Sequence, residues 1–254
     1  MIIATIVEGP SDHEVIKTIV NRLLPGSHRY LPLQPVSSLN ENGEVAYGET
    51  GTGWKGVRRW CRETWQRSES SLDALLESVD NAPIDLLIMH IDADIVENED
   101  LQDGSDDPID LANTPCPPIR ETVENLKHVI LNWLNRQTLP PQVAFMIPSQ
   151  DTENWVFAAL YSSDPLCLQE DYECIKTGSR QREHPGYLLT LEKYGRLLRY
   201  RDGKIKKSGR MYQNLLPPLS THWDNVCSIS SQAQNFSQDV LQIAAGGFPS
   251  DAAI

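Results

Sequence analysis

Acidic side chains follow three of the apolar runs in this chain of 254 residues. Glu8 and Asp12 come after the first run, Asp92 and Asp94 after a later one, and Glu153 after the last. Asp92 and Asp94 are two residues apart, so in a fully extended strand both side chains would lie on one face and could hold one ion. Carboxylate oxygens suit Mg²⁺ or Mn²⁺ better than Zn²⁺. The pattern therefore predicts a divalent-metal site.

The elements that must position these acids can be predicted from hydrophobic periodicity. Four apolar, β-rich runs predict strands, over residues 2–7, 30–36, 84–91 and 142–147. Apolar side chains three or four apart predict helices, over residues 15–23, 57–79, 119–133 and from about 155 onward. Alternating strands and helices indicate an α/β fold with a Rossmann-like parallel sheet flanked by helices. Ligands of such sheets bind at the carboxyl ends of the strands, where the acids are expected to meet.

Residues 1–165 are expected to form this core, and residues 166–254 a mainly helical and irregular extension. Within the core, residues 97–116 are acidic and lack periodicity, which predicts a long loop. At the start of the first helix, Ser11 and Glu14 have the spacing of a capping box. The glycines between Gly48 and Gly56 lack the Gly-Lys-Ser/Thr ending of an ATP-binding loop, so no ATP site is expected.

The formal net charge of −13 first argues against a phosphate-bearing partner. However, residues 68–119 contain 14 of the 35 acids and no Lys or Arg, which leaves 22 basic against 21 acidic residues elsewhere. Two basic runs flank this segment. The second, over residues 196–210, is predicted to form either a charged hairpin or a solvated helix end. Either run could be only a solvated face, but both are candidate nucleic-acid contacts. The candidate side chains are Lys55, Arg58, Arg59, Arg62, Lys204, Lys206 and Lys207.

Cysteine usage and hydropathy favour a cytoplasmic protein that does not enter a membrane. No apolar run approaches the roughly 18 residues of a membrane helix, and the first residues lack the cationic start of a signal peptide. The chain has five scattered cysteines without a Cys-x-x-Cys pair, which favours reduced, buried thiols over a disulfide framework or zinc site. These are Cys61, Cys116, Cys167, Cys174 and Cys227.

Four motifs, in this order, resemble a known catalytic domain. They are Val7 to Asp12 (VEGPSD), Gly51 to Gly56 (GTGWKG), Asp92 to Asp94 (DAD), and Ile147 to Trp155 (IPSQDTENW). The order is similar to that of the TOPRIM domain found in topoisomerases, primases and the nucleases of the overcoming-lysogenization-defect (OLD) type. The closer resemblance is to a TOPRIM-like family catalogued as domain of unknown function 4276, over roughly residues 1–165.

The resemblance implies a TOPRIM-like sheet and Mg²⁺- or Mn²⁺-dependent hydrolysis of nucleic-acid phosphodiesters. Glu8 would then be a ligand or general acid/base, and Asp92 and Asp94 would bind the metal. Asp12 and Glu153 match acids that hold a second ion in OLD-type nucleases. Those nucleases often use a lysine as well, for which Lys176 and Lys193 are candidates by order alone. By analogy, the resemblance implies that the protein acts with a separately encoded ATPase in antiphage or mobile-element defence.

Two other functions are compatible with part of the pattern. An Asp-x-Asp pair after a buried strand also holds Mn²⁺ and a nucleotide sugar in glycosyltransferases, although that reading leaves Glu8 and Glu153 unexplained. Alternatively, the domain could be a non-catalytic adaptor of an ATPase. Trp54, Trp60 and Trp65 with the neighbouring arginines would then form a protein interface, although Trp60 also has the spacing of a core residue.

Overall fold

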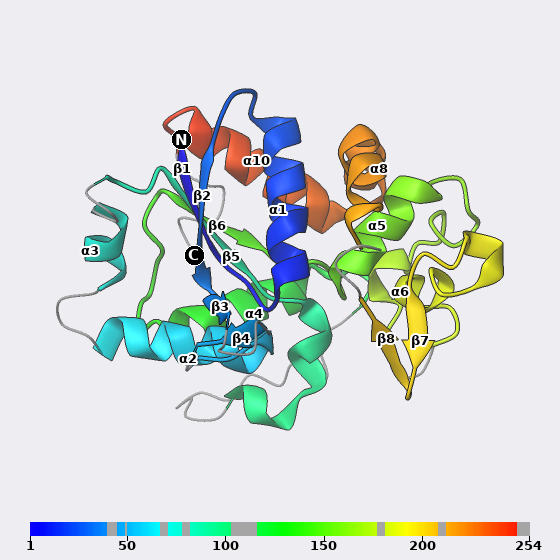
Figure 1. Cartoon of the computed structure of the whole chain (residues 1–254), viewed down its shortest axis with the longest axis horizontal. Coiled ribbons are helices and arrows are strands. Elements are labelled where there is room, and N and C mark those ends of the chain that lie inside the picture. Colours follow the sequence, from blue (N-terminus) through cyan, green and yellow to red (C-terminus); the bar gives the residue numbers. More distant parts are fainter. Residues whose placement is uncertain are drawn as a thin grey trace.

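The computed structural model describes residues 1–39, 45–48, 50–66, 71–77, 82–102, 116–176, 181–207 and 212–247. Its centre is a four-stranded sheet in the order β2-β1-β5-β6, in which all neighbouring strands are parallel (Figure 1). The strands are β1 (Ile2–Ile6), β2 (Arg29–Gln34), β5 (Leu86–His90) and β6 (Val143–Met146). The predicted α/β fold with a parallel sheet is therefore confirmed.

Both faces of the sheet are buried, as the continuous apolar runs predict. Side chains alternate between the faces: Ile3 and Ile88 belong to one hydrophobic cluster, whereas Ala4 and Leu87 belong to the other. The register places Ile3 beside Leu86, so the central strands β1 and β5 align from their first residues. This alignment also brings their carboxyl ends together.

Helices cover each face. The first cluster includes side chains of α1 (Pro10–Leu23), α5 (Thr152–Leu160) and α10 (Ser231–Ala244). The second includes side chains of α2 (Gly53–Gln66), α3 (Leu72–Glu77) and α4 (Arg120–Trp133). Figure 1 shows α1 and α10 on one side of the strands and α2 and α4 on the other.

Two local sequence predictions near the site are wrong. Helix α1 begins at Pro10 with Gly9 as its N-cap, and no side chain caps it, so Ser11 and Glu14 do not form a capping box. Glu14 instead pairs with Lys17 at 3.1 Å. Strand β5 ends at His90, and the chain turns into a 3₁₀ helix over Ala93–Glu97, so the two aspartates do not share a strand face.

The predicted loop over residues 97–116 is not irregular at its start. A second 3₁₀ helix spans Glu99–Gln102, directly after the first. Residues 103–115 lie outside the described residues. A short antiparallel pair, β3 (Ser37–Leu39) and β4 (Val45–Tyr47), follows β2.

The C-terminal elements share the hydrophobic core of the sheet. They comprise α6 (Pro185–Leu188), the hairpin β7 (Arg199–Arg201) and β8 (Lys204–Lys206), α8 (Leu216–Thr221), α9 (Trp223–Ile229) and α10, with 3₁₀ turns at Tyr172–Cys174 and Glu192–Tyr194. Trp155 of α5 is fully buried, and its ring packs edge-on against Trp223 at 5.3 Å. Its indole Nε1 donates to Ser230 Oγ at 3.1 Å, at the start of α10. The C-terminal helices thus hold α5 in place.

Two cysteines depart from the predicted reduced state. Cys116 and Cys174 form a disulfide between the segment before α4 and the 3₁₀ turn after α5. Cys61, Cys167 and Cys227 are free thiols. Sequence spacing could not reveal the pair, because the two cysteines are 58 residues apart and meet only through the fold. In the described part of the chain, no helix has the length and apolar character needed to cross a membrane.

Candidate metal and phosphodiester site

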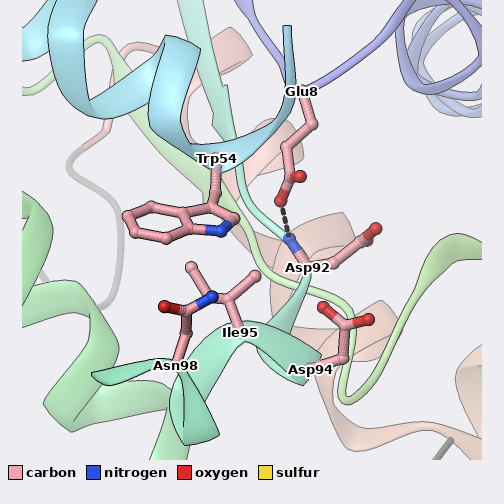
Figure 2. A pocket seen from close by; sticks show the side chains of 6 residues that line it. All are labelled: Glu8, Trp54, Asp92, Asp94, Ile95 and Asn98. Carbon is pink, nitrogen blue, oxygen red and sulfur yellow. Dashed lines mark hydrogen bonds between the residues drawn. The ribbon is translucent and has the colours of Figure 1, made fainter. Parts of the chain in front are cut away.

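The carboxyl ends of β1 and β5 open into one hollow of about 490 Å³. It is lined by Glu8, Trp54, Asp92, Asp94, Ile95 and Asn98. Figure 2 shows Trp54 forming one wall, with the Glu8 and Asp94 carboxylates on either side of Asp92. Three of the five predicted metal ligands therefore line a single pocket at the sheet edge where ligands of parallel sheets bind.

Glu8 and Asp92 are joined directly. The Asp92 backbone N–H donates to Glu8 Oε1 at 2.9 Å (Figure 2). On the other side, His90 Nε2 lies 3.1 Å from Asp92 Oδ1. Since His90 is the fully buried last residue of β5, this contact fixes the direction of the Asp92 side chain.

The pKa values of the pocket acids reflect crowding of like charges. Burial of the Glu8 carboxyl, together with repulsion from Asp92, raises its pKa to about 8. Asp94 is exposed at the pocket mouth, yet the protein around its carboxyl and the charge of Asp92 raise its pKa to about 7. For His90, burial favours the neutral ring, but Asp12 and Asp92 outweigh it and raise the pKa to about 9. The histidine is therefore a cation at neutral pH.

Asp12 lies behind this pocket, in the first turn of α1. It is only 4% exposed, and Thr152 Oγ1 donates to its Oδ1 at 3.3 Å. The same hydroxyl contacts Tyr212 OH at 3.2 Å, so Asp12 is linked to both α5 and the chain before α8. Burial raises the pKa of Asp12 although His90 and Lys207 attract its charge.

Glu153 is the fifth predicted ligand. Its side chain is 1% exposed, in the first turn of α5, and Lys207 Nζ lies 2.8 Å from its Oε1. The sequence predicts Lys207 as a nucleic-acid contact and gives Lys176 and Lys193, by order alone, as candidates for a lysine of the cluster. The structure instead places Lys207 there. Lys193 contacts Tyr194 and Asp164 instead. Burial opposes the charge of Lys207, but Glu153 outweighs it and holds the lysine pKa well above its usual value.

Asp151 and His184 also belong to the cluster. Asp151 caps α5, because its Oδ1 accepts from the Asn154 N–H at 3.3 Å, and its Oδ2 lies 3.4 Å from His184 Nε2. Burial and the charge of Glu153 raise the pKa of Asp151 well above its ordinary value. Burial lowers the pKa of His184 to about 4, so its ring is neutral at pH 7. A histidine on another element leaves no spacing signal, which is why His184 was missed.

Backbone bonds beyond the strands bring the two acidic segments together. The Ala93 N–H donates to Pro148 O at 3.1 Å, and the Asp94 N–H donates to Gln150 O at 3.0 Å. The pairing of β5 with β6 is thus continued past the ends of both strands. It places the turn that carries Asp92 against the turn that leads to Glu153.

The charges of the cluster do not balance without a further cation. Its six carboxyl groups are Glu8, Asp12, Asp92, Asp94, Asp151 and Glu153. Against them stand the ammonium of Lys207 and the ring of His90, so full ionisation leaves 6 − 2 = 4 uncompensated negative charges. For Glu8, Asp12, Asp94 and Asp151, burial is the main cause of the raised pKa, and repulsion from neighbouring carboxylates adds to it. One or two divalent cations would neutralise the excess negative charge.

The donor set fits a hard cation in its chemistry. Among the described residues, however, no three His, Cys, Asp or Glu side chains are already gathered in a metal-binding arrangement. Mg²⁺ usually keeps several of its waters and takes only one or two carboxylates directly. Carboxylates arranged around a hollow, with room for water between them, are compatible with that mode of binding.

The glycine-rich stretch before α2 has a structural explanation. Gly51 and Gly53 both have φ of +71°, a conformation that favours glycine. A Cβ on Gly56 would lie 2.6 Å from the Gln34 amide nitrogen, which donates to Gly51 O. The stretch thus packs α2 tightly against the end of β2. The Gly53 N–H also donates to Glu8 O at 2.8 Å, which sets Trp54 beside the pocket.

The basic residues of α2 lie next to this wall and contact other parts of the chain. Lys55 pairs with Asp100, and Arg58 donates to the Asp100 carbonyl at 2.6 Å. Both cations also lie over the Trp54 ring, at 5.4 and 5.1 Å from its centre. Arg59 donates to Thr50 O at 3.1 Å, and Arg62 also has a partner. Their contact with nucleic acid remains a prediction.

The second basic run forms a hairpin, one of the two structures predicted for it. Lys204 and Lys206 lie on β8, outside the carboxylate cluster, and Lys206 is exposed. Lys207, one residue further on, is the only predicted nucleic-acid contact that the described structure places against a predicted metal ligand. Its ammonium faces inward although 29% of its side chain is exposed.

Comparison with known proteins gives no relative from which a function could be transferred. No protein-family model, no curated protein and no solved structure matches the chain.

Proposed function

We propose that this chain is a Mg²⁺- or Mn²⁺-dependent nuclease, which hydrolyses phosphodiester bonds of DNA or RNA. The observation that carries the proposal is the gathering of six carboxyl groups from three separate segments at one sheet edge, against two cationic groups among the described residues. Like charges are brought together at such a cost to stability mainly where function requires them. A cation and an anionic substrate would use both signs of charge in the cluster.

Glu8, Asp92 and Asp94 would hold one ion at the pocket, and Asp12 and Glu153 would contribute to a second ion deeper in the cluster. The bound ion would supply an activated water and stabilise the charge on the leaving oxygen. Protein groups would fix the ligands: the Asp92 N–H orients Glu8, His90 orients Asp92, and Thr152 orients Asp12. Such hydrogen bonds commonly tune metal ligands.

Lys207 would act on the substrate itself. Its ammonium is a compact point charge, suited to a non-bridging phosphate oxygen. In the metal-free protein it pairs with Glu153, and a cation near that carboxylate would leave the lysine available to the phosphate. Trp54 forms a wall of the pocket with its half-buried ring, where it would shield a bound phosphate from water.

The proposal also covers the protein family and the biological role. The four motifs support membership of the TOPRIM-like family catalogued as domain of unknown function 4276, with kinship to OLD-type nucleases. A role in antiphage or mobile-element defence, together with a separate ATPase, would follow from that resemblance alone. The proposed cytoplasmic location rests instead on the hydropathy of the sequence.

The test is incubation of single- and double-stranded DNA and of RNA with the purified chain and Mg²⁺ or Mn²⁺. Cleavage is expected with the wild type and not with Asp92→Asn, which preserves the shape of the side chain and the backbone bond to Glu8. Asp73→Asn is the matched control. Asp73 lies on α3, away from the pocket, and pairs with Arg136. Equal cleavage by Asp92→Asn and wild type would refute the proposed site. A metal-dependent rise in melting temperature without any cleavage would favour the non-catalytic adaptor.

A further inference from the structure

The hairpin of β7 and β8 stands beside the candidate site and has two unlike faces. Its turn is Asp202-Gly203, with φ of +54° and +74°, as in a type I′ hairpin turn. Tyr200 pairs with Ile205 across the strands. Ile205 packs against the core, and the Tyr200 ring, although 41% exposed, packs edge-on against Tyr187 at 5.3 Å.

The inward face fixes the hairpin against the cluster. Ile205 lies so close to Gly186 that a Cβ there would come within 2.9 Å of its Cδ1. The same Cβ would be 3.3 Å from the Glu153 side chain. Gly186 of α6 therefore lets the hairpin and the acidic turn of α5 approach each other, and Figure 1 shows the hairpin next to α6.

The outward face is basic, and the strand register sets like charges opposite each other. Arg199 pairs with Lys206, and Arg201 pairs in backbone register with Lys204. Alternate strand residues share a face, so Arg199, Arg201 and Lys206 lie opposite the side of Tyr200 and Ile205. Cations directly across from one another destabilise a two-stranded pair. Arg199, Arg201 and Lys206 are all exposed.

Little in the protein offsets this charge. Arg201 lies 3.4 Å from its neighbour Asp202. Arg199 and Lys206 have no carboxylate partner among the residues that the structure describes. An unfavourable cross-strand arrangement that the described part of the chain leaves unbalanced is suited to an external polyanion.

The outward face of the hairpin leads directly to the candidate site. Lys206 points to solvent and the next residue, Lys207, reaches Glu153. Because one residue of extended chain covers about 3.3 Å, a phosphate held at Lys206 would lie near the mouth of the carboxylate cluster. We propose that the outward face of the hairpin binds the phosphate backbone of a nucleic acid and presents the next phosphodiester to Lys207. Only the presentation of a phosphodiester to Lys207 rests on the proposed nuclease function. The binding of the phosphate backbone does not depend on it.

The test separates binding from hydrolysis. Binding of a fluorescent 20-nucleotide DNA is measured by anisotropy in EDTA over a range of salt, for wild type, Arg199→Gln/Lys206→Gln and the matched control Lys17→Gln/Arg22→Gln on α1. Each lost phosphate contact lowers the salt slope by about one unit, so the hairpin variant is expected to lose about two. At 0.1 M salt that corresponds to about 100-fold weaker binding. The control should bind like the wild type.

Activity provides the second readout. With Mn²⁺, the hairpin variant should have a higher KM for the oligonucleotide than the wild type. It should hydrolyse bis(p-nitrophenyl) phosphate, a small diester that cannot span the hairpin, at the wild-type rate. Its melting temperature should be unchanged or slightly higher, because opposed cations are removed. An unchanged salt slope, or a loss no larger than in the control, would overturn the inference. Wild type that binds no oligonucleotide at low salt would also overturn it and favour an acidic protein partner.

The two proposals fail separately. If no diester is hydrolysed and the hairpin variant still loses binding, the nuclease function fails and the nucleic-acid surface stands. If diesters are hydrolysed and the hairpin variant binds normally, the surface fails and the nuclease function stands.

Discussion

The ion pair between Lys207 and Glu153 can be tested by removing only the ammonium. In Lys207→Met the carboxylate of Glu153, 1% exposed, loses the cation that lies 2.8 Å from it. Breaking a buried pair by deleting one partner costs about 3–5 kcal/mol, because an uncompensated charge stays buried. Since 29% of the Lys207 side chain is exposed, we expect Lys207→Met to lower the free energy of unfolding by about 3 kcal/mol, the lower end of this range.

The assay is urea unfolding at pH 7 in EDTA, followed by tryptophan fluorescence and supported by thermal melting. For a chain of this size a loss of about 3 kcal/mol corresponds to a fall in Tm of roughly 6 °C. The second variant, Glu153→Gln/Lys207→Met, removes the stranded charge and should recover most of the loss. Lys206→Met, at the exposed neighbouring position, should stay within about 0.5 kcal/mol of wild type. The reasoning is refuted if Lys207→Met is as stable as Lys206→Met, or if the double variant is no more stable than Lys207→Met.

Three further outcomes follow from other parts of the structure. Glu8 has an ordinary pKa of 4.5 and a folded pKa of about 8, so the folded state binds more protons between these values. This carboxyl alone should lower stability by about 1.4 kcal/mol per pH unit from pH 5 to 7, and the raised pKa of Asp94 acts in the same direction; urea midpoints in EDTA that do not fall as the pH rises would contradict this. The Cys116–Cys174 disulfide closes a loop of 58 residues, for which chain entropy gives a stabilisation of about 4 kcal/mol. Dithiothreitol should therefore lower the urea midpoint of the wild type and leave the midpoint of Cys116→Ser/Cys174→Ser unchanged. Trp155→Ala should cost about 3–5 kcal/mol by calorimetry, whereas a loss below about 1 kcal/mol would show that α5 does not depend on this contact.

The parallel sheet and most of its acids could be predicted because they depend on local patterns. An apolar run such as Leu86–His90 reads as a buried strand whatever surrounds it, and parallel strands end at one edge. Glu8 and Asp92 therefore met as expected. What failed was the path of the chain after a strand, since the 3₁₀ turn at Ala93 depends on backbone bonds to Pro148 and Gln150, far away in sequence.

The missing parts of the site come from tertiary contacts. Lys207 is one cation in a basic run, and its pairing with Glu153 depends on the close approach of the hairpin to α6 and α5 at Ile205, Gly186 and Glu153. The Asp202-Gly203 pair was an available signal for the hairpin, although not for its docking. His90 offered a further signal, because a histidine inside an otherwise apolar strand requires a polar partner, here Asp92.

The late position of Lys207 has a consequence for how the protein is made. All six acids of the cluster are in the chain once residue 153 has been synthesised, yet their lysine follows 207 − 153 = 54 residues later. Domains fold as they emerge, N-terminal parts first. A nascent chain of that length thus has the acids with His90 but without Lys207, and the helices that hold α5 come later still. The order of synthesis itself delays assembly of the cluster until Lys207 and the helices that follow it have been made.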